Sequence, residues 1–84
     1  MNLLDLGLRV GDRVRFRRKD TERWKDAVVR HLEQDGSVGL SDQKGASRSI
    51  PVDRIEVRSR GPRGGVLWVP LAEHAADKEQ LGLF

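Results

Sequence analysis

Three arginines alternate with apolar residues between positions 13 and 17, and this spacing is the feature of the sequence with the clearest chemical consequence. Arg13, Arg15 and Arg17 are separated by Val14 and Phe16. Because successive side chains of a β-strand point to opposite faces, the pattern predicts a strand with one buried face and one face of guanidinium groups. Like charges side by side repel one another, so the exposed face suits an acidic protein surface or a polyanion.

Basic residues are concentrated in two segments of the chain. Residues 9 to 30 hold nine basic and four acidic side chains, and residues 54 to 63 hold four and one. Residues 64 to 84 hold one basic and three acidic side chains, within a total net charge of +3. This distribution favours a polyanion partner for the body of the chain, although arginine-rich surfaces also serve solubility alone. The residues that we expect to contact nucleic-acid phosphates are Arg13, Arg15, Arg17, Arg18, Lys19, Arg58, Arg60 and Arg63.

No spacing of residues is typical of a catalytic or metal site. His31 and His74 are far apart, and neither has a ligand or nucleophile at a useful distance along the chain. Asp35, Asp42 and Asp53 lie near expected turns, where carboxylates usually accept hydrogen bonds from backbone amides. We therefore expect a protein that is not an enzyme and that needs no metal or cofactor.

Length and composition indicate one small domain. A chain of 84 residues buries only about 60 to 65 % of its unfolded surface, and the absence of cysteine excludes disulfides as a supplement to its core. No apolar run reaches the roughly 18 residues that a membrane span requires, and MNLLDLGL lacks the features of a signal peptide. We expect a cytoplasmic protein without a membrane partner, associated with the nucleoid if it binds DNA.

Alternating residues and turn formers predict five short strands. A second strand over 24–32 is expected to point Trp24, Ala27 and Val29 inward, with Trp24 closing one end of a barrel and Arg30 facing outward. The remaining strands are expected at 37–42, at 47–50 and from residue 55 onward, and residues 51–54 are expected to form a tight or 3₁₀ turn. Hairpin turns are predicted at Asp35-Gly36 and at Gly45.

Four segments together resemble the SH3-like barrel in its Tudor-type form. They are GDRVRF, WKDAVV, DGSVGLSD and RSIPVDRIEV, and the resemblance covers roughly residues 10–58. It implies a mainly β fold, a small five-stranded SH3-like barrel, with an extra strand or strap and a short α-helix after it. Such barrels bind peptides, methylated side chains, RNA or DNA, so the resemblance alone does not select a function.

Aromatic content argues against one function of these barrels. A cage for methylated lysine or arginine needs several aromatic rings around the cation. This sequence offers only Phe16, Trp24, Trp68 and Phe84, and we expect the first two to be used by the core. Methyl-mark recognition is therefore disfavoured.

Three segments lie outside the expected barrel. Residues 1–9 are expected to form an irregular or extended arm, and 59–65 a basic Gly/Arg linker. Within residues 66–80 we expect an apolar strand or strap, in which Val66, Leu67 or Trp68 covers an open side of the barrel, and then a short helix. Pro70 suits the first turn of that helix, whose inner side is expected to carry Leu71 and Ala75, with Ala72 and Ala76 as further candidates.

Residues 80–84 carry a second resemblance. The sequence Gln80-Leu81-Gly82-Leu83-Phe84 is similar to the Gln-Leu-x-Leu-Phe motif by which bacterial polymerases and repair factors dock on the DNA sliding clamp. The resemblance implies that Gln80 occupies a polar subsite and that Leu83 and Phe84 enter a hydrophobic cleft. The alternative is that Leu81, Leu83 and Phe84 pack back on the small core.

The sequence is compatible with two main functional hypotheses and a weaker third. The first is a non-enzymatic adaptor in DNA replication or repair, whose basic barrel contacts nucleic acid while residues 80–84 dock on the sliding clamp. The second is a protein-interaction module or small regulatory subunit whose barrel and tail pack in a larger assembly. An RNA-binding barrel is a third option, weakened by Trp24 and Lys25 at the place of that family's glycine-centred loop.

Overall fold

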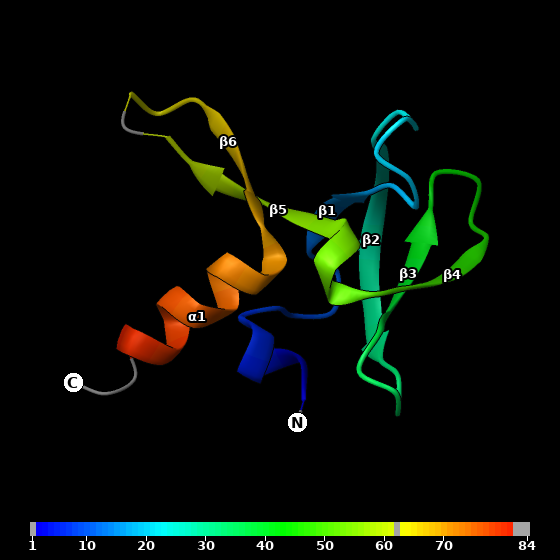
Figure 1. Cartoon of the computed structure of the whole chain (residues 1–84), viewed down its shortest axis with the longest axis horizontal. Helices are drawn as coiled ribbons and strands as arrows, with labels where there is room; N and C mark the ends of the chain where they lie inside the picture. The colour runs from blue at the N-terminus through cyan, green and yellow to red at the C-terminus, as the bar shows by residue number, and fades with distance from the viewer. Residues whose placement is uncertain (1, 62, 82–84) are drawn as a thin grey trace.

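The computed structural model describes residues 2–61 and 63–81, with side chains described as far as Ala76. This part of the chain forms six β-strands, one α-helix and two 3₁₀ turns (Figure 1). The elements are η1 Leu3–Leu6, β1 Arg13–Phe16, β2 Lys25–Leu32, β3 Val38–Asp42, β4 Ser47–Ile50, η2 Val52–Arg54, β5 Ile55–Arg60, β6 Val66–Pro70 and α1 Leu71–Leu81.

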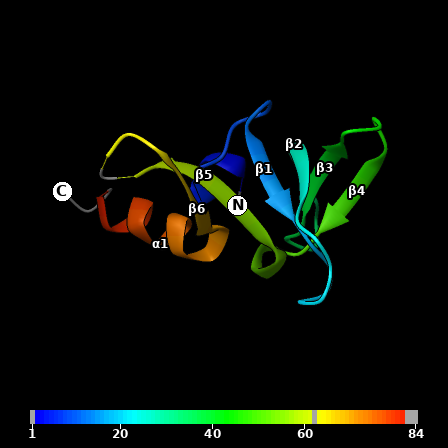
Figure 2. The same cartoon turned by 90° about the horizontal axis from the view of Figure 1, so that it is seen from above.

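All six strands belong to one antiparallel sheet with the order β4-β3-β2-β1-β5-β6. The prediction of a mainly β fold is confirmed. The sheet is open, with β4 and β6 as its edges, so it is not the closed five-stranded barrel that was expected, and the extra segment expected as a strand or a strap is its sixth strand (Figure 2). The sixth strand arises because the chain after β5 turns back along it rather than crossing the sheet as a strap.

One face of the sheet carries the core, as the alternation in β1 predicts. Val14 and Phe16 are buried there beside Ala27, Val29, Val38, Leu40, Ile50, Ile55 and Val57. The helix α1 and the turn η1 lie beside the β5–β6 half of the sheet, away from β4 (Figures 1 and 2). Leu8 and Leu71 are 1% and 0% exposed, so both terminal segments supply core side chains.

The amino-terminal segment is more regular than the irregular or extended arm that we expected. Asn2 caps η1 by accepting a hydrogen bond from the Asp5 amide, and the Asp5 carboxylate accepts one from the Asn2 amide. This capping box satisfies backbone donors that would otherwise lack partners at the start of the turn. It orients the segment so that Leu6 and Leu8 reach the core.

The predicted turns are confirmed. Gly36 and Gly45 take φ values of 90° and 81°, which glycine adopts without the steric cost that other residues meet. Both turns are closed by backbone hydrogen bonds, from Gly36 to Glu33 and from Gly45 to Asp42. The 3₁₀ turn η2 joins β4 to β5 after Pro51, as expected.

Three expectations about hydrophobic residues are wrong. Trp24 does not close a barrel, because its half-buried ring lies over the guanidinium groups of Arg15 and Arg17 on the face opposite the core. Val66 and Leu67 are 58% and 48% exposed, and the residue of β6 that packs on the core is Val69. On α1 the inner side carries Leu71 and Ala75 as predicted, whereas Ala72 and Ala76 are exposed.

The basic segment 59–65 is part of a hairpin rather than a linker between two elements. Ser59 and Arg60 belong to β5, and the turn that follows is closed by hydrogen bonds between Gly61 and Gly65 and between Gly64 and Gly61. The backbone of Gln80 and Leu81 belongs to α1, while Gly82, Leu83 and Phe84 lie outside the described residues. No helix in the described part of the chain is long and apolar enough to cross a membrane.

Candidate anion-binding cleft

The face of the sheet opposite the core carries a continuous row of side chains across five strands. In the register of the sheet, Arg13 lies opposite Val28, and Val28 lies opposite Ser41 on β3. On the other side of β1, Val14 lies opposite Val57 of β5. Moving one residue along each of these antiparallel strands places Arg58 opposite Arg13. Arg58 in turn lies opposite Trp68 on β6. The row therefore has two arginines at its centre.

The neighbouring row on the same two strands is electrostatically balanced. Arg15 and Glu56 are direct partners in the β1–β5 ladder, and Arg15 Nε donates to Glu56 Oε1 at 2.8 Å. The Arg15 guanidinium also lies 4.4 Å from the ring centre of Trp24 and 4.7 Å from that of Trp68, within the range of cation–π attraction. Arg15 is thus held by a carboxylate and two aromatic rings, which leaves it little capacity for a ligand.

Arg13 and Arg58 have no such compensation. Both are exposed, and no carboxylate among the described side chains lies within 4.0 Å of either guanidinium. Like charges that face each other across strands are destabilising, typically by a few tenths of a kcal/mol up to about 1 kcal/mol. An anion placed between the two groups would convert this repulsion into charge-assisted hydrogen bonds.

A cleft of about 640 Å³ lies over this row, and we call it the outer-face cleft. The side chains that give it its chemical character are Arg13, Val28, Arg30, Ser41, Arg58 and Trp68. Asp26 also lines it, whereas the Asp42 carboxylate is occupied by the Lys44 and Ala46 amides at 2.9 Å and by Arg48. The outer-face cleft therefore combines three guanidinium groups and an aromatic ring with two carboxylates, of which that of Asp26 accepts a long hydrogen bond from Gln43 Nε2 at 3.4 Å.

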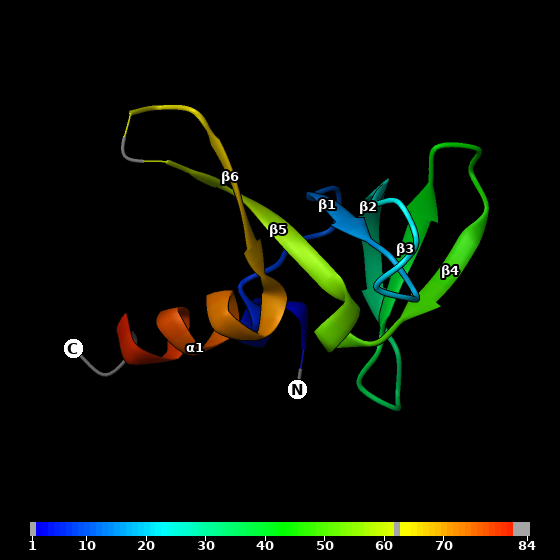
Figure 3. The same cartoon turned by 45° about the horizontal axis from the view of Figure 1, so that its top comes forward.

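A smaller cleft of about 300 Å³ continues the outer-face cleft along the hairpin. The two clefts share Arg58 and Val66, and the smaller one adds Arg60 and the backbone of Gly64 and Gly65. Figures 1 and 3 show that the β5–β6 hairpin extends away from β2, β3 and β4. A ligand longer than one phosphate group therefore has a continuous path from the middle of the sheet toward the end of the hairpin.

The structure separates the predicted nucleic-acid contacts into three groups. Arg13, Arg58 and Arg60 line the two clefts. Arg15 and Arg17 stack on Trp24, with the Arg17 guanidinium 4.3 Å from the ring centre. The rest are exposed outside the clefts, Arg18 and Lys19 between β1 and β2 and Arg63 in the β5–β6 turn.

Sequence reasoning missed two residues of the outer-face cleft as binding residues. Arg30 was expected to face outward, but it had no assigned role; it lies at an irregularity in the β2–β3 register, between Val29 and His31. Trp68 was one of three residues, with Val66 and Leu67, expected to cover an open side of the barrel. The segment was expected to be a strand or a strap, and period-2 alternation through a strand with Val69 inward places Trp68 on the outer face.

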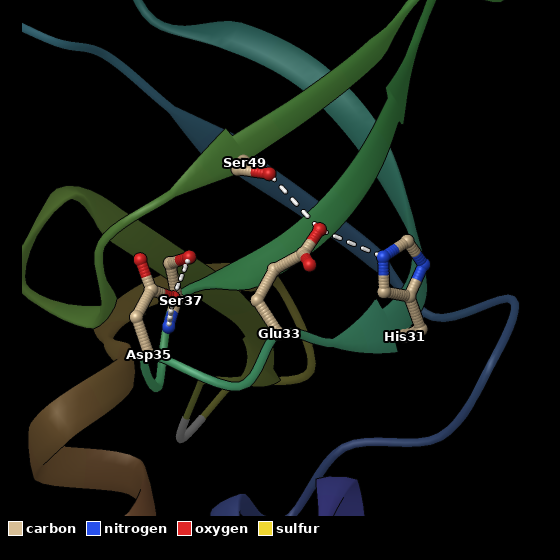
Figure 4. Close-up of polar contacts among 5 residues, drawn as sticks. All are labelled: His31, Glu33, Asp35, Ser37 and Ser49. Carbon is tan, nitrogen blue, oxygen red and sulfur yellow. Dashed lines mark hydrogen bonds and ion pairs between the residues drawn. The ribbon is translucent and has the colours of Figure 1, made fainter.

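A second polar cluster lies at the β2–β3 turn (Figure 4). The Glu33 carboxylate contacts His31 Nε2 at 2.8 Å and accepts a hydrogen bond from the Ser49 hydroxyl at 3.0 Å, and these contacts lower the pKa of Glu33. Asp35 accepts hydrogen bonds from the hydroxyl and the amide of Ser37, which lower the pKa of Asp35. The Ser49 hydroxyl donates to a carboxylate and not to His31, so these contacts connect the β2–β3 turn to β4.

Acidic and histidine side chains do not converge elsewhere in the described residues. His74 Nε2 lies 3.2 Å from the backbone oxygen of Gly7, which ties α1 to the turn after η1. No group of three or more potential metal ligands is found in the described part of the chain. The turn aspartates Asp35 and Asp42 accept backbone hydrogen bonds, as the sequence predicted for them.

Comparisons with protein-family models, with curated proteins and with solved structures found no match to this chain. The chemistry of the outer-face cleft is therefore interpreted from its own geometry. That geometry combines paired cations, an aromatic wall and a path along the hairpin.

Proposed function

We propose that this protein is a non-enzymatic nucleic-acid-binding module whose phosphate contacts are centred on Arg13 and Arg58. The observation that carries the proposal is the contrast between two adjacent rows of the β1–β5 ladder. One row pairs Arg15 with Glu56, whereas the next row sets Arg13 beside Arg58 without a carboxylate among the described side chains. A phosphate oxygen supplies the missing negative charge.

The chemistry of arginine fits this role. A guanidinium group presents a planar set of donors that matches phosphate geometry, and charge-assisted hydrogen bonds are about twice as strong as neutral ones. Contacts to phosphate carry no direct sequence information, so binding is expected to tolerate many sequences. Arg30 and Arg60 extend the cationic surface on either side of the central pair.

The proposed fold family is the SH3-like barrel, in an open form. Its support is the order β4-β3-β2-β1-β5, in which β5 returns to pair with β1 after the 3₁₀ turn η2, together with the four sequence segments quoted above. The family hosts many functions, so the nucleic-acid proposal depends on the cleft and not on the fold.

A salt titration tests this function. We expect the logarithm of the binding constant for a fluorescein-labelled oligonucleotide to fall with the logarithm of salt concentration, with a slope of about −1.5 to −3 for two or three phosphate contacts. Electrostatic binding to phosphates is strongest at low salt. Absence of binding at about 20 mM salt therefore overturns the proposal.

Docking on the DNA sliding clamp is a second proposed activity, and it is supported by the match of residues 80–84 to the clamp-binding motif. The backbone of Gln80 and Leu81 is helical, so extended docking requires the last turn of α1 to unwind. Once the tail is bound to the clamp, the cleft meets nearby DNA at an effective concentration of about 1 mM. Clamp docking would therefore strengthen weak binding to DNA.

Clamp docking is tested by capture of purified bacterial sliding clamp on immobilised protein. We expect capture by the wild type and loss of capture by the double variant Leu83→Ala, Phe84→Ala, with thermal unfolding measured in parallel. If the variant unfolds or aggregates instead, the tail contributes to the core, and the self-packing alternative is correct.

A further inference from the structure

Phosphate binding alone does not explain the aromatic and apolar side chains in the wall of the outer-face cleft. Its wall contains the ring of Trp68 and the apolar side chains of Val28 and Val66, next to the arginines. Duplex nucleic acid presents phosphates and sugars on its outside, while the faces of its bases are stacked inside. A single strand presents both phosphates and free base faces, which stack on aromatic side chains.

We infer that the ligand of the outer-face cleft is a single-stranded nucleic acid, with a base stacked against Trp68 and an adjacent phosphate held by Arg13 and Arg58. This inference rests on the proposed nucleic-acid-binding function and specifies the form of the ligand. Its basis is that Trp68 and Arg58 are direct neighbours in the β5–β6 ladder, so that one nucleotide reaches both groups.

The shape of the site supports the same conclusion. The outer-face cleft and the smaller cleft share Arg58 and Val66, and together they lead from Ser41 on β3 to Arg60 near the end of the hairpin. A flexible single strand is able to follow the two clefts and to present a base to Trp68, whereas a duplex keeps its base faces stacked inside. Arg60 then lies where the next phosphate along the strand would pass.

The two tryptophans of the chain have different surroundings, which makes them separable in an experiment. Trp24 has guanidinium groups 4.4 Å and 4.3 Å from its ring centre, and it is not among the residues of the outer-face cleft. Trp68 lines the cleft and has one described guanidinium over its ring, that of Arg15 at 4.7 Å from the ring centre. A protein with Trp24→Phe keeps a ring at position 24 and leaves Trp68 as its single tryptophan.

The experiment measures binding to a labelled 12-nucleotide DNA, an RNA of the same sequence and the corresponding duplexes, by fluorescence anisotropy at low salt. We expect both single strands to bind at least about 10-fold more tightly than either duplex. Trp68→Leu is expected to weaken single-strand binding by about 5- to 150-fold, the usual effect of losing one stacking contact, and to change duplex binding little. The matched control is Leu67→Ala, on the same strand and facing away from the cleft.

A second measurement does not depend on how well Trp68→Leu folds. In the Trp24→Phe protein, saturating single strand is expected to quench the emission of Trp68, because the base covers its ring. Unchanged emission on saturation overturns the inference, as does a duplex that binds as tightly as the single strands. Absence of binding to every oligonucleotide overturns the proposed function itself, so the two failures are distinguishable.

Discussion

The imidazole of His31 lies directly against Gly39, its partner in the β2–β3 ladder. A Cβ atom at position 39 would stand 2.5–2.8 Å from three ring atoms of His31, closer than real side chains approach. Gly39 is therefore required for the position of the ring, and the position of the ring brings His31 to Glu33 (Figure 4).

Replacing this glycine tests the link between ring position and the acidic cluster. In Gly39→Ala we expect the His31 ring to move outward and its contact with Glu33 to be lost, so that the pKa of Glu33 returns toward its ordinary value of 4.5. The side chain of His31 is 58% exposed, so it is able to move away from the added methyl group at little cost. Alanine also reduces the conformational entropy of the unfolded chain, which favours the folded state. The free energy of unfolding should therefore change by less than about 1 kcal/mol. A carboxyl-detected NMR titration of Glu33 makes the measurement, and an unchanged Glu33 pKa would contradict this prediction.

The acidic residues of the β2–β3 and β3–β4 turns predict how stability depends on pH. The pKa of Glu33 is lowered first by His31, that of Asp35 by Ser37 and that of Asp42 by the Ala46 amide. A carboxyl group whose pKa is lower in the folded than in the unfolded chain stabilises the fold above its unfolded pKa, and this contribution disappears as pH falls through the folded value. We therefore expect the melting temperature to decrease as the pH is lowered from about 4.5 through 3.8 and below.

Asp42→Asn provides the matched comparison for the pH dependence. Asparagine retains an oxygen that accepts the Lys44 and Ala46 amides but does not titrate. The decrease in melting temperature between pH 5 and pH 2.5 should be smaller in this variant than in the wild type. Equal decreases in the two proteins would show that Asp42 does not contribute.

Glu56 is expected to matter more for stability than exposed acidic residues do. The side chains of Arg15 and Glu56 are 25% and 19% exposed, so removing the carboxylate leaves a partly desolvated guanidinium unpaired. We expect Glu56→Ala to lower the free energy of unfolding by about 1–2 kcal/mol in urea denaturation, between the values typical of exposed and of buried pairs. The control is Glu22→Ala, which breaks a 3.7 Å contact with the 56% exposed Lys25 and should cost less than about 0.5 kcal/mol.

Local patterns explain why much of the sheet was predictable. Two kinds of local pattern predicted the first five strands: the alternation of Val14 and Phe16 with arginines, and the turn residues around Gly36 and Gly45. Most of the predicted strand bounds lie within about one residue of the observed bounds. The pairing of β5 with β6 was not predicted, because Arg58 and Arg60 are followed by a glycine-rich turn, a composition that is also typical of linkers.

The binding site depended on information that local patterns do not contain. The neighbourhood of Arg13 and Arg58 follows from the register between two strands that are more than 40 positions apart in the sequence. Trp24 was assigned to the core because aromatic residues usually lie there, but the guanidinium groups of Arg15 and Arg17 offer its ring an alternative partner on the outer face. Composition identified the charge of the surface, and only the fold showed which arginines remain available.

In the variant Arg13→Glu, stability and binding are predicted to change in opposite directions, because Arg13 and Arg58 repel each other in the free protein and both contact phosphate in the complex. The new carboxylate lies between Arg15 and Arg58, so repulsion becomes attraction and the melting temperature should rise by about 1–5 °C. Oligonucleotide affinity should fall by at least about 10-fold, the effect of losing one charge-assisted phosphate contact. Arg23→Glu, which makes the same change of net charge at an exposed position outside the clefts, is the control and should reduce affinity by less than about 3-fold.

Both quantities are obtained from one preparation of each protein, by thermal unfolding and by fluorescence anisotropy with the same labelled strand. We expect Arg13→Glu to be more stable than the wild type and to bind the strand far more weakly than Arg23→Glu does. An Arg13→Glu protein that keeps the affinity of the Arg23→Glu control, or that unfolds at a lower temperature than the wild type, would contradict this expectation.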